Sequence, residues 1–274
     1  MVMNIGWFST GRDKAARDLF NSVYKEIRRG AIKADISFVF CNRVLGEDRE
    51  SDSFIKMVKD YGINLISYSS RDFKSDMRLR GKKDFATFHL WRRDYDTEIM
   101  KRLRNYNSDL IVLAGYMLIV SGDMCEKFNM INLHPAAPGG PSGTWQEVIW
   151  KLIDSKANTT GVMMHLVTSH LDQGPPVTYC TFPIRGHLFD ELWNDLYRRL
   201  KTTSLTQIIE KDGEKNQLFM EIRKHGFMRE LPLLVQTIKA FADGRIKLEN
   251  KRLFMQNETL EHGLCLNDEI EAFL

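Results

Sequence analysis

The sequence lacks several features that mark whole classes of protein. Its four cysteines are scattered and form no C-x-x-C pair, which argues against a disulfide framework and a structural zinc site. No stretch approaches the roughly 18 consecutive apolar residues that a membrane-spanning helix needs. The first residues show no basic region followed by an apolar block, so we expect no secretory signal. These absences predict a cytoplasmic protein without a membrane partner.

Strong charge and a dinucleotide fingerprint are missing as well. The net charge is only +3, which is too small for the electrostatic footprint of a nucleic-acid binder. Basic residues cluster in "RLRGKK" (78–83) and "WRRDYD" (91–96), which we interpret as solvated surface. The first turn has one glycine, Gly11, instead of G-x-G-x-x-G, and the second expected strand ends in Asn42 rather than an acidic residue. We therefore expect neither a nucleic-acid partner nor a dinucleotide.

Alternating strand and helix patterns dominate the first half of the chain. With 274 residues, 43% of them hydrophobic, the chain can bury a substantial core. The alternation predicts an α/β fold, Rossmann-like, with a mostly parallel open sheet flanked by helices. The expected strands are 3–8, 35–42, 63–69, 109–117 and one ending at 134, and the expected helices are 15–27, 51–61 and 95–106, with a polar, basic loop over 70–90.

The second half predicts an antiparallel edge and a helical C-terminal part. Strands at 160–168 and 178–184, joined by a Gly-Pro turn, indicate a hairpin near the sheet edge. The other expected elements are a helix over 145–154, a leucine-striped helix over 188–200, a long helix ending near 243 and a small hairpin over 244–256. We expect an α/β domain over 1–185 and a helical extension with a terminal hairpin, 186–274, packed on the same domain.

The stretch "MINLHPAAPGG" (130–140) ends an expected strand with Asn132 and His134. Residues two apart on a strand share a face, so both side chains point the same way at the strand's end. Ligands of open α/β sheets bind at the carboxyl ends of the strands. An amide donor and an imidazole are suited to stabilising a developing oxyanion, and the imidazole can move a proton near neutral pH. We interpret the pair as candidate catalytic residues.

Two further features are candidates at the same edge. The first turn, Ser9 to Asp13, precedes an expected helix whose N-terminus could bind an anion. Asp172 lies in the turn "HLDQGPP" and would orient the imidazole of His134 if this turn folds over the strand's end. A metal site is disfavoured, because His165 and His170 are an odd number of residues apart and would face oppositely on a strand.

With these pieces in place, the chain resembles the folate-dependent formyltransferases, and among them those that act on glycinamide ribonucleotide. The matching stretches include "MNIGWFSTG", "FVFCNR", "DLIVLAGYMLIVS", "MINLHP", "TTGVMMHLVTSHLDQGPPV" and "LPLLVQTIKAFADGRI". The combination of N-x-H-P with a later L-D-x-G-P is specific in this context. The resemblance covers most of the chain.

The resemblance implies roles for the residues found above. Asn132 and a protonated His134 would stabilise the oxyanion formed when an amine attacks the formyl carbon of 10-formyltetrahydrofolate. Asp172 would hold His134 and help to carry a proton to the folate nitrogen, with no metal required. The implied folate-binding residues are Tyr116, Met117, Leu118, Ile119, Val120, Val167, Thr168, His170 and Leu171. The implied acceptor-binding residues are Thr10, Gly11, Arg12, Asp13, Gly115 and Lys224.

Alternatives remain open for the acceptor. The first turn reads Ser-Thr-Gly-Arg-Asp where the family has Gly-Asn-Gly-Ser-Asn, and Asp13 would repel a phosphate. Glycinamide ribonucleotide is the default acceptor, as in purine synthesis. An amino-sugar nucleotide, another amine or water could take its place, and a non-catalytic folate- or nucleotide-binding protein is the alternative from another class. We expect a monomer or a homodimer.

Overall fold

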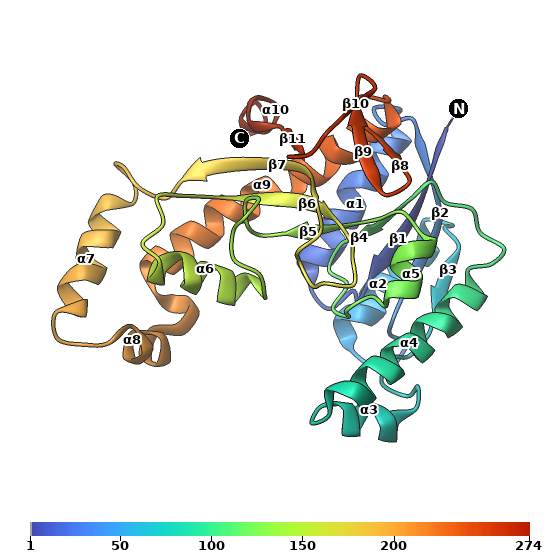
Figure 1. The fold of residues 1–274 in the computed structure, drawn as a ribbon, viewed down its shortest axis with the longest axis horizontal. Helices are drawn as coiled ribbons and strands as arrows, with labels where there is room; N and C mark the ends of the chain where they lie inside the picture. The colour runs from blue at the N-terminus through green and yellow to red at the C-terminus, as the bar shows by residue number, and fades with distance from the viewer. Residues whose placement is uncertain (1) are drawn as a thin grey trace.

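An eight-stranded sheet forms the centre of the computed structural model, which describes residues 2–274 (Figure 1). The strand order is β11-β7-β6-β5-β4-β1-β2-β3. Its strands, in chain order, are β1 (Met3–Ser9), β2 (Ala34–Cys41), β3 (Leu65–Ser67), β4 (Leu110–Leu113), β5 (Met130–His134), β6 (Thr159–Leu166), β7 (Pro176–Pro183) and β11 (Leu264–Cys265).

The pairing of the strands confirms the predicted α/β architecture. Strands β1 to β5 pair in parallel, whereas β5–β6 and β6–β7 pair antiparallel, and β11 runs parallel to β7. The strand order changes direction between β1 and β4, which is where ligands of such sheets bind. The predicted hairpin of β6 and β7 is therefore present, one strand in from the edge.

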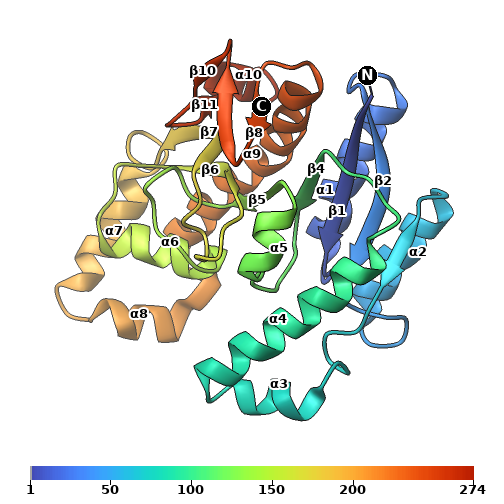
Figure 2. The same cartoon turned by 45° about the vertical axis from the view of Figure 1, so that its right-hand side comes forward.

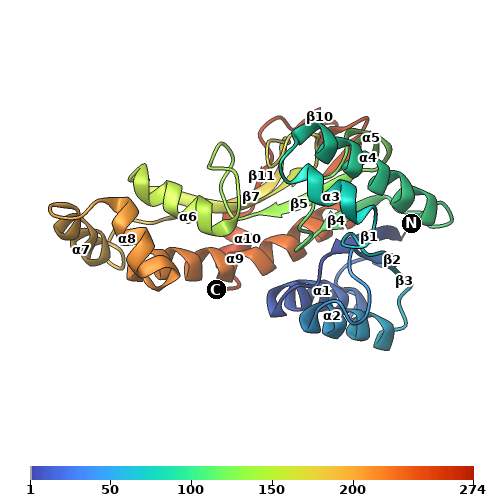
Figure 3. The ribbon, with the colours of Figure 1, turned by 90° about the horizontal axis from the view of Figure 1, so that it is seen from below.

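Side chains of the central strands alternate between two cores, one on each face of the sheet. Trp7 packs in the core below the sheet in the view of Figure 3, and its neighbour Phe8 packs in the core above it. The lower face is covered by α1 (Lys14–Arg28), α2 (Arg49–Asp60) and α9 (Gln217–Ala242), and the upper face by α4 (Phe85–Arg102) and α5 (Gly122–Lys127). Because both faces are covered, the central strands are apolar throughout, as their sequences predicted.

A third core lies away from the main sheet, in the arm that extends to the left in Figures 1 and 3. Trp193 and Phe219 are both completely buried in it. The arm consists of α6 (Trp145–Asp154), α7 (Asp190–Leu200), α8 (Leu205–Asp212), the short 3-10 helix η1 (Gly213–Lys215) and the first half of α9. The second half of α9 packs under the sheet, so this one helix joins the arm to the main core.

The C-terminal segment adds two small elements beside the main sheet. A three-stranded sheet consists of β8 (Lys247–Glu249), β9 (Arg252–Met255) and β10 (Glu258–Thr259), which includes the predicted hairpin. The short helix α10 (Asn267–Glu271) follows β11 and buries Ile270 in the main core. None of the helices in residues 2–274 is long and apolar enough to cross a membrane.

The prediction of a loop over 70–90 is wrong. Residues Ser75–Gly81 form helix α3, and α4 begins at Phe85 rather than near residue 95, so that two helices pack against each other at the lower edge of Figure 2. A Cβ on Gly81 would lie 2.9 Å from the Cα of Phe88, so only glycine permits this close approach. The polar and basic sequence gave no signal for α3 or the first half of α4, because much of their surface faces solvent.

Candidate active site

The end of β5 places two polar side chains in a cleft of about 400 Å³. Asn132 and His134 both line it, as their shared strand face predicted. The imidazole of His134 is almost fully buried, with 2% of the residue exposed. The walls of the cleft come from the first turn and the start of α1, the loop after β4, the turn after β6, the start of α6 and the middle of α9.

A second histidine, His165, orients the amide of Asn132. The two residues lie directly opposite each other in the antiparallel pairing of β5 with β6. Nδ1 of His165 lies 2.9 Å from the carbonyl oxygen of Leu166, to which it can only donate, and Nε2 lies 3.1 Å from Nδ2 of Asn132. Burial lowers the pKa of His165 below its ordinary value. The neutral ring therefore accepts from the Asn132 amide and fixes which end of it carries the N–H groups.

Both ring nitrogens of His134 face oxygen atoms. Nε2 lies 2.9 Å from the carbonyl oxygen of Pro141, and Nδ1 lies 3.7 Å from Oδ2 of Asp172. The loop after β5 thus turns back onto its own histidine. The doubly protonated imidazole is the form that can donate to both oxygens.

Asp172 lies between the two histidines. Its Oδ1 is 3.8 Å from Nε2 of His165, and its Oδ2 accepts a hydrogen bond from the backbone N–H of Gly143 at 3.3 Å. The backbone of Asp172 adopts a left-handed conformation with a φ of 54°, which Asp tolerates better than most residues. The distance to His134 is slightly longer than a direct hydrogen bond, so a water or a small closure of the turn would connect them.

All nine residues that the resemblance implied for folate binding line this cleft. They belong to two segments, the loop after β4 and the turn after β6. The lining residues that the resemblance implied are Tyr116, Met117, Leu118, Ile119, Val120, Val167, Thr168, His170 and Leu171. A smaller pocket of about 210 Å³ shares Ile119 and Val120 with the cleft.

A buried arginine lines this smaller pocket. Arg92 is 2% exposed and pairs with the buried carboxylate of Asp96. Its Nη2 also lies 3.4 Å from the hydroxyl of Tyr116. Nη1 of Arg92 is buried without any hydrogen-bond partner. A buried donor of this kind is costly unless a ligand or water satisfies it.

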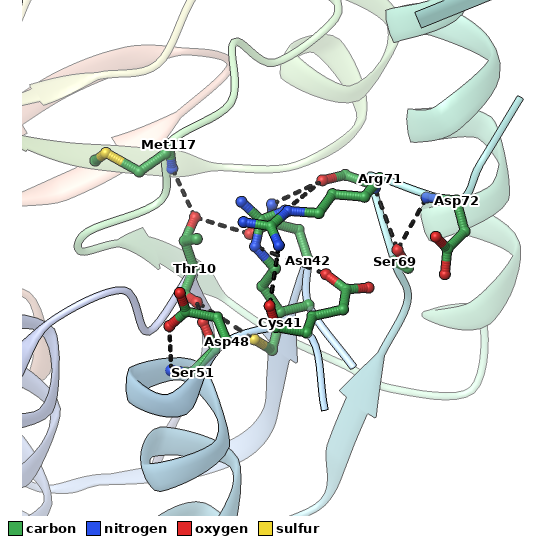
Figure 4. A network of polar contacts seen from close by, with 12 residues as sticks. Thr10, Cys41, Asn42, Asp48, Ser51, Ser69, Arg71, Asp72 and Met117 are labelled. Atoms are coloured by element: carbon green, nitrogen blue, oxygen red, sulfur yellow. Dashed lines mark hydrogen bonds and ion pairs between the residues drawn. The ribbon is translucent and has the colours of Figure 1, made fainter. Parts of the chain in front are cut away.

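The first turn is largely satisfied by its own neighbours (Figure 4). The hydroxyl of Thr10 donates to Oδ1 of Asn42 at 2.8 Å and accepts from the backbone N–H of Met117 at 2.9 Å. Asp13 accepts from the N–H of Ala16 and so caps α1. Of the turn residues proposed to bind an acceptor, Arg12 and Asp13 line the cleft with Gly115, whereas Thr10 and Gly11 do not.

Gly11 and Cys41 show how tightly this region is packed. Gly11 has a φ of 62°, and a Cβ there would lie 2.7 Å from the Cβ of Phe54, so glycine is required by both conformation and space. Burial raises the pKa of the Cys41 thiol to about 12, which excludes a thiolate nucleophile at this position.

The cleft is also lined by residues of α9 that the sequence did not single out. Arg223 and Glu230 on α9 form an ion pair and both line the cleft, and the guanidinium of Arg223 lies over the ring of Trp145 at 4.6 Å. Lys224, which the resemblance implied, is exposed and pairs with Glu221. The spacing of Arg223 and Glu230 at i and i+7 on a predicted helix was the available signal.

No metal-binding cluster of three or more His, Cys, Asp or Glu side chains is found among residues 2–274. The group formed by His134, His165 and Asp172 is held instead by hydrogen bonds to Asn132 and to backbone groups.

Comparisons with known proteins agree with this geometry. The phosphoribosylglycinamide formyltransferase of Schizosaccharomyces pombe is 31% identical over 131 residues, which is 45% of this chain and 63% of that relative. The enzyme of the same name in Dictyostelium discoideum is 34% identical over 103 residues, which is 34% of this chain and 50% of that relative. The chain thus matches between half and two thirds of the length of these curated relatives.

Solved structures support the fold. The phosphoribosylglycinamide formyltransferase of Coxiella burnetii superposes with a TM-score of 0.65 at 17% identity, covering 97% of this chain and 99% of that one. A formyltetrahydrofolate deformylase from Pseudomonas syringae gives a TM-score of 0.58 at 16% identity, covering 93% of this chain and 66% of that one. At these low identities the two structures support the fold and nothing more specific.

The family model described as "Formyl transferase" matches residues 14–210, well over half of the chain. The matched range contains Asn132, His134, His165 and Asp172. It begins after the first turn and ends before α9, so Arg12, Asp13, Arg223 and Glu230 lie outside it. The chain belongs to the formyl transferase family.

Proposed function

We propose that the protein transfers the formyl group of 10-formyltetrahydrofolate to a primary amine, with glycinamide ribonucleotide as the default acceptor. The observation that supports this most directly is the meeting of Asn132, His134 and Asp172 in one cleft, beside the folate wall that the family resemblance implies. A protein that only binds folate needs no such combination of amide, imidazole and carboxylate.

The proposed chemistry begins with attack of the amine nitrogen on the formyl carbon. The carbonyl electrons move to the oxygen, and the second N–H of Asn132 and the protonated ring of His134 stabilise the resulting oxyanion. Because His165 already holds one N–H of Asn132, the other is left to point at the reacting group. Fixing the amide in advance avoids reorganisation during the reaction.

Collapse of the intermediate requires a proton transfer. The attacking nitrogen must lose a proton, and N10 of the folate must gain one as its bond to the formyl carbon breaks. Asp172 is positioned to relay this proton through a water, since its carboxylate faces the cleft beside His134. The products are the formylated amine and tetrahydrofolate, and no covalent enzyme intermediate is needed.

The donor is proposed to lie against the loop after β4, with its ring between residues 116–120 and the turn 167–172. The smaller pocket continues from this wall through Ile119 and Val120. The glutamate end of the donor carries carboxylates, and the unpartnered Nη1 of Arg92 is a suitable cation for one of them. This placement leaves the Arg223 side of the cleft for the acceptor.

A second candidate keeps the donor and changes the acceptor. It is favoured by the first turn, where Thr10 bonds to Asn42 and Asp13 caps α1 instead of presenting a phosphate site. The acceptor would then be an amino-sugar nucleotide, another amine or water. In each case Arg223, flanked by Trp145, and Arg12 are the basic side chains available to the acceptor in the cleft.

An acceptor screen tests both candidates. Purified protein is incubated with 10-formyltetrahydrofolate and one acceptor at a time, and release of tetrahydrofolate is followed by absorbance. Turnover with glycinamide ribonucleotide that falls by about 10²- to 10³-fold in Asn132→Ala is the expected result. Turnover only with an amino-sugar nucleotide would move the assignment to the second candidate.

Two results would contradict formyl transfer altogether. One is the absence of turnover with every amine and with water. The other is a slow hydrolysis that is equally fast in the wild type and in Asn132→Ala, since the proposed oxyanion would then have no role. Asn194→Ala, which changes an exposed asparagine on the arm, is the matched control and should retain wild-type turnover.

A further inference from the structure

The loop between β5 and α6 contacts two of the proposed catalytic side chains through its backbone. The carbonyl oxygen of Pro141 lies 2.9 Å from Nε2 of His134, and the N–H of Gly143 donates to Oδ2 of Asp172 at 3.3 Å. Oδ2 is also the oxygen that faces Nδ1 of His134. Among residues 2–274, the N–H of Gly143 makes the one hydrogen bond that this carboxylate accepts. The direction of a single backbone N–H therefore fixes the oxygen that faces the imidazole.

That N–H belongs to the peptide group that joins Ser142 to Gly143. The peptide is trans, so its carbonyl oxygen and its N–H point in opposite directions. The N–H points to Asp172, and on the other side the carbonyl oxygen of Ser142 accepts a hydrogen bond from Nζ of Lys151 at 2.8 Å. One peptide plane is therefore held from both sides, by a carboxylate on one and by an ammonium group on the other.

The local sequence leaves this peptide free to rotate. Gly143 has a φ of 120°, and a Cβ there would lie 2.6 Å from Oε2 of Glu147, so the path of the chain requires glycine. Glycine also lets the adjoining peptide turn over at little cost, because it populates both signs of φ. A rotated peptide would direct the carbonyl oxygen of Ser142 at Asp172 and set two negative oxygen atoms against each other. A contact that holds this carbonyl oxygen on the other side excludes the rotated form.

Lys151 makes that contact from helix α6. Side chains of a helix lean toward its N-terminus, so Lys151 reaches back along α6 to the loop that precedes the helix. The start of the same helix is fixed by the capping box of Thr144 and Glu147. Lys151 itself is exposed and does not line the cleft. Its influence on a bound substrate therefore passes through the loop.

We propose that Lys151 is a positioning residue for formyl transfer, which rests on the catalytic roles proposed above for Asp172 and His134. Its ammonium group holds the peptide between Ser142 and Gly143 with the N–H toward Asp172, and so keeps Oδ2 beside the imidazole. The cation also strengthens this N–H as a donor, because hydrogen bonds in series polarise one another. Lys151 thus supports the proton relay without touching a reacting group.

Kinetics of two variants at this position test the proposal. Lys151→Met keeps an unbranched side chain and a high helix propensity, and removes the ammonium group. With the acceptor found in the screen, kcat should fall by about threefold to tenfold, the size of one net hydrogen bond. KM for both substrates should stay within about twofold, because the lining of the cleft is unchanged. Lys151→Arg, which keeps a cationic donor, should hold kcat within about twofold of the wild type.

Hydrogen exchange at the Gly143 amide reports on the same peptide without requiring turnover. Followed by NMR, this amide should exchange about tenfold faster in Lys151→Met than in the wild type, and at close to the wild-type rate in Lys151→Arg. The matched control is Lys56→Met. Lys56 is exposed on α2, which lies apart from α6 in Figure 3, so this variant should alter neither kcat nor the exchange of Gly143.

The outcomes separate this proposal from the proposed function. Turnover by the wild type together with unchanged kcat and unchanged Gly143 exchange in Lys151→Met overturns the role of Lys151 alone. A rise in KM as large as the fall in kcat also overturns it, because the loop would then act as part of the binding surface. Equal losses in Lys151→Met and Lys151→Arg deny a role for the cation. Absence of turnover in the wild type overturns the proposed function, and faster Gly143 exchange in Lys151→Met would then still support the hold on the peptide.

Discussion

Two strand ends at the same edge of the sheet are equally rich in polar groups and differ in what those groups do. At the end of β5, Asn132 and His134 face the cleft, where Asn132 keeps one N–H and Nδ1 of His134 lies 3.7 Å from Asp172, beyond a direct hydrogen bond. At the end of β1, Thr10 and its partner Asn42 bond to each other and to their neighbours (Figure 4). The first arrangement is open to chemistry, whereas the second closes on itself.

The two strand ends differ in how many hydrogen-bonding groups have no partner within the protein, and not in their residue types. The hydroxyl of Thr10 makes two hydrogen bonds within the protein, while Asn132 makes one and keeps a second N–H. Polar residues at the carboxyl end of a strand therefore identify an edge where ligands bind, and the internal bonds decide which of them take part. Changes at the two ends should accordingly affect different quantities, activity at β5 and stability at β1.

The largest expected effect is at His134. His134→Ala removes the cation proposed to stabilise the oxyanion, so kcat should fall by about 10²- to 10⁴-fold in the acceptor assay. His187→Ala changes an exposed histidine at the base of the arm and should leave kcat unaltered. A loss smaller than tenfold in His134→Ala would show that the imidazole is not part of the chemistry.

At the end of β1 the expected effect is on folding. Thr10→Val keeps the shape of the side chain but leaves Oδ1 of Asn42 and the N–H of Met117 without their partner. The free energy of unfolding, measured with urea, should decrease by about 1–3 kcal/mol. Thr206→Val, at an exposed helix position, should change it by less than about 0.5 kcal/mol. An unchanged stability in Thr10→Val would remove the contrast between the two strand ends.

Much of this comparison could be predicted from the sequence. Two-residue periodicity placed Asn132 and His134 on one face, and the alternation of strands and helices placed that face at a ligand-binding edge. Both predictions depend on local geometry, which short stretches of sequence determine. Asp172 was assigned to the site through the family resemblance. The sequence alone did not require this role, because aspartate is common in turns, where it bonds to the local backbone.

The rest depends on contacts between segments far apart in the sequence. His165 became significant only through the register of β6 against β5, which sets it opposite Asn132. Helix α3 and the first half of α4 were missed because a polar, basic segment lacks the apolar periodicity that identifies helices, and their packing depends on the approach of Gly81 to Phe88. Arg223 was missed in favour of Lys224 because the rotation of α9 about its axis is fixed by tertiary packing.

His165 connects the two quantities, activity and stability. In His165→Gln a flexible amide, which can present either its oxygen or its N–H groups, replaces the fixed acceptor nitrogen of the ring, so the amide of Asn132 loses its fixed orientation. We expect kcat to fall by about twofold to tenfold, the size of one net hydrogen bond. The same measurement on His187→Gln serves as the control, and equal losses in the two variants would deny His165 its positioning role.

The stability of the same variant should show a difference in pH dependence. Burial holds the pKa of folded His165 below the ordinary value of 6.5, so below about pH 6.5 the unfolded chain takes up a proton that the folded chain does not. The wild-type free energy of unfolding should therefore decrease as the pH falls from 7 to 5.5. Part of that decrease should be missing in His165→Gln, and identical pH profiles would show that His165 titrates normally.

The smallest expected effect is at Asp13. Two substitutions at this one residue separate the hydrogen bond of its carboxylate from its charge. Asp13 lines the cleft but also accepts from the N–H of Ala16. We expect its main role to be that of the cap of α1. Asp13→Ala should lower the free energy of unfolding by about 1 kcal/mol. Asp13→Asn should keep most of that stability, because asparagine caps a helix about as well and only the charge is lost. If the two variants lose equal stability, the carboxylate's charge matters more than its hydrogen bond, and the β1 end would hold an electrostatic site rather than a closed set of hydrogen bonds.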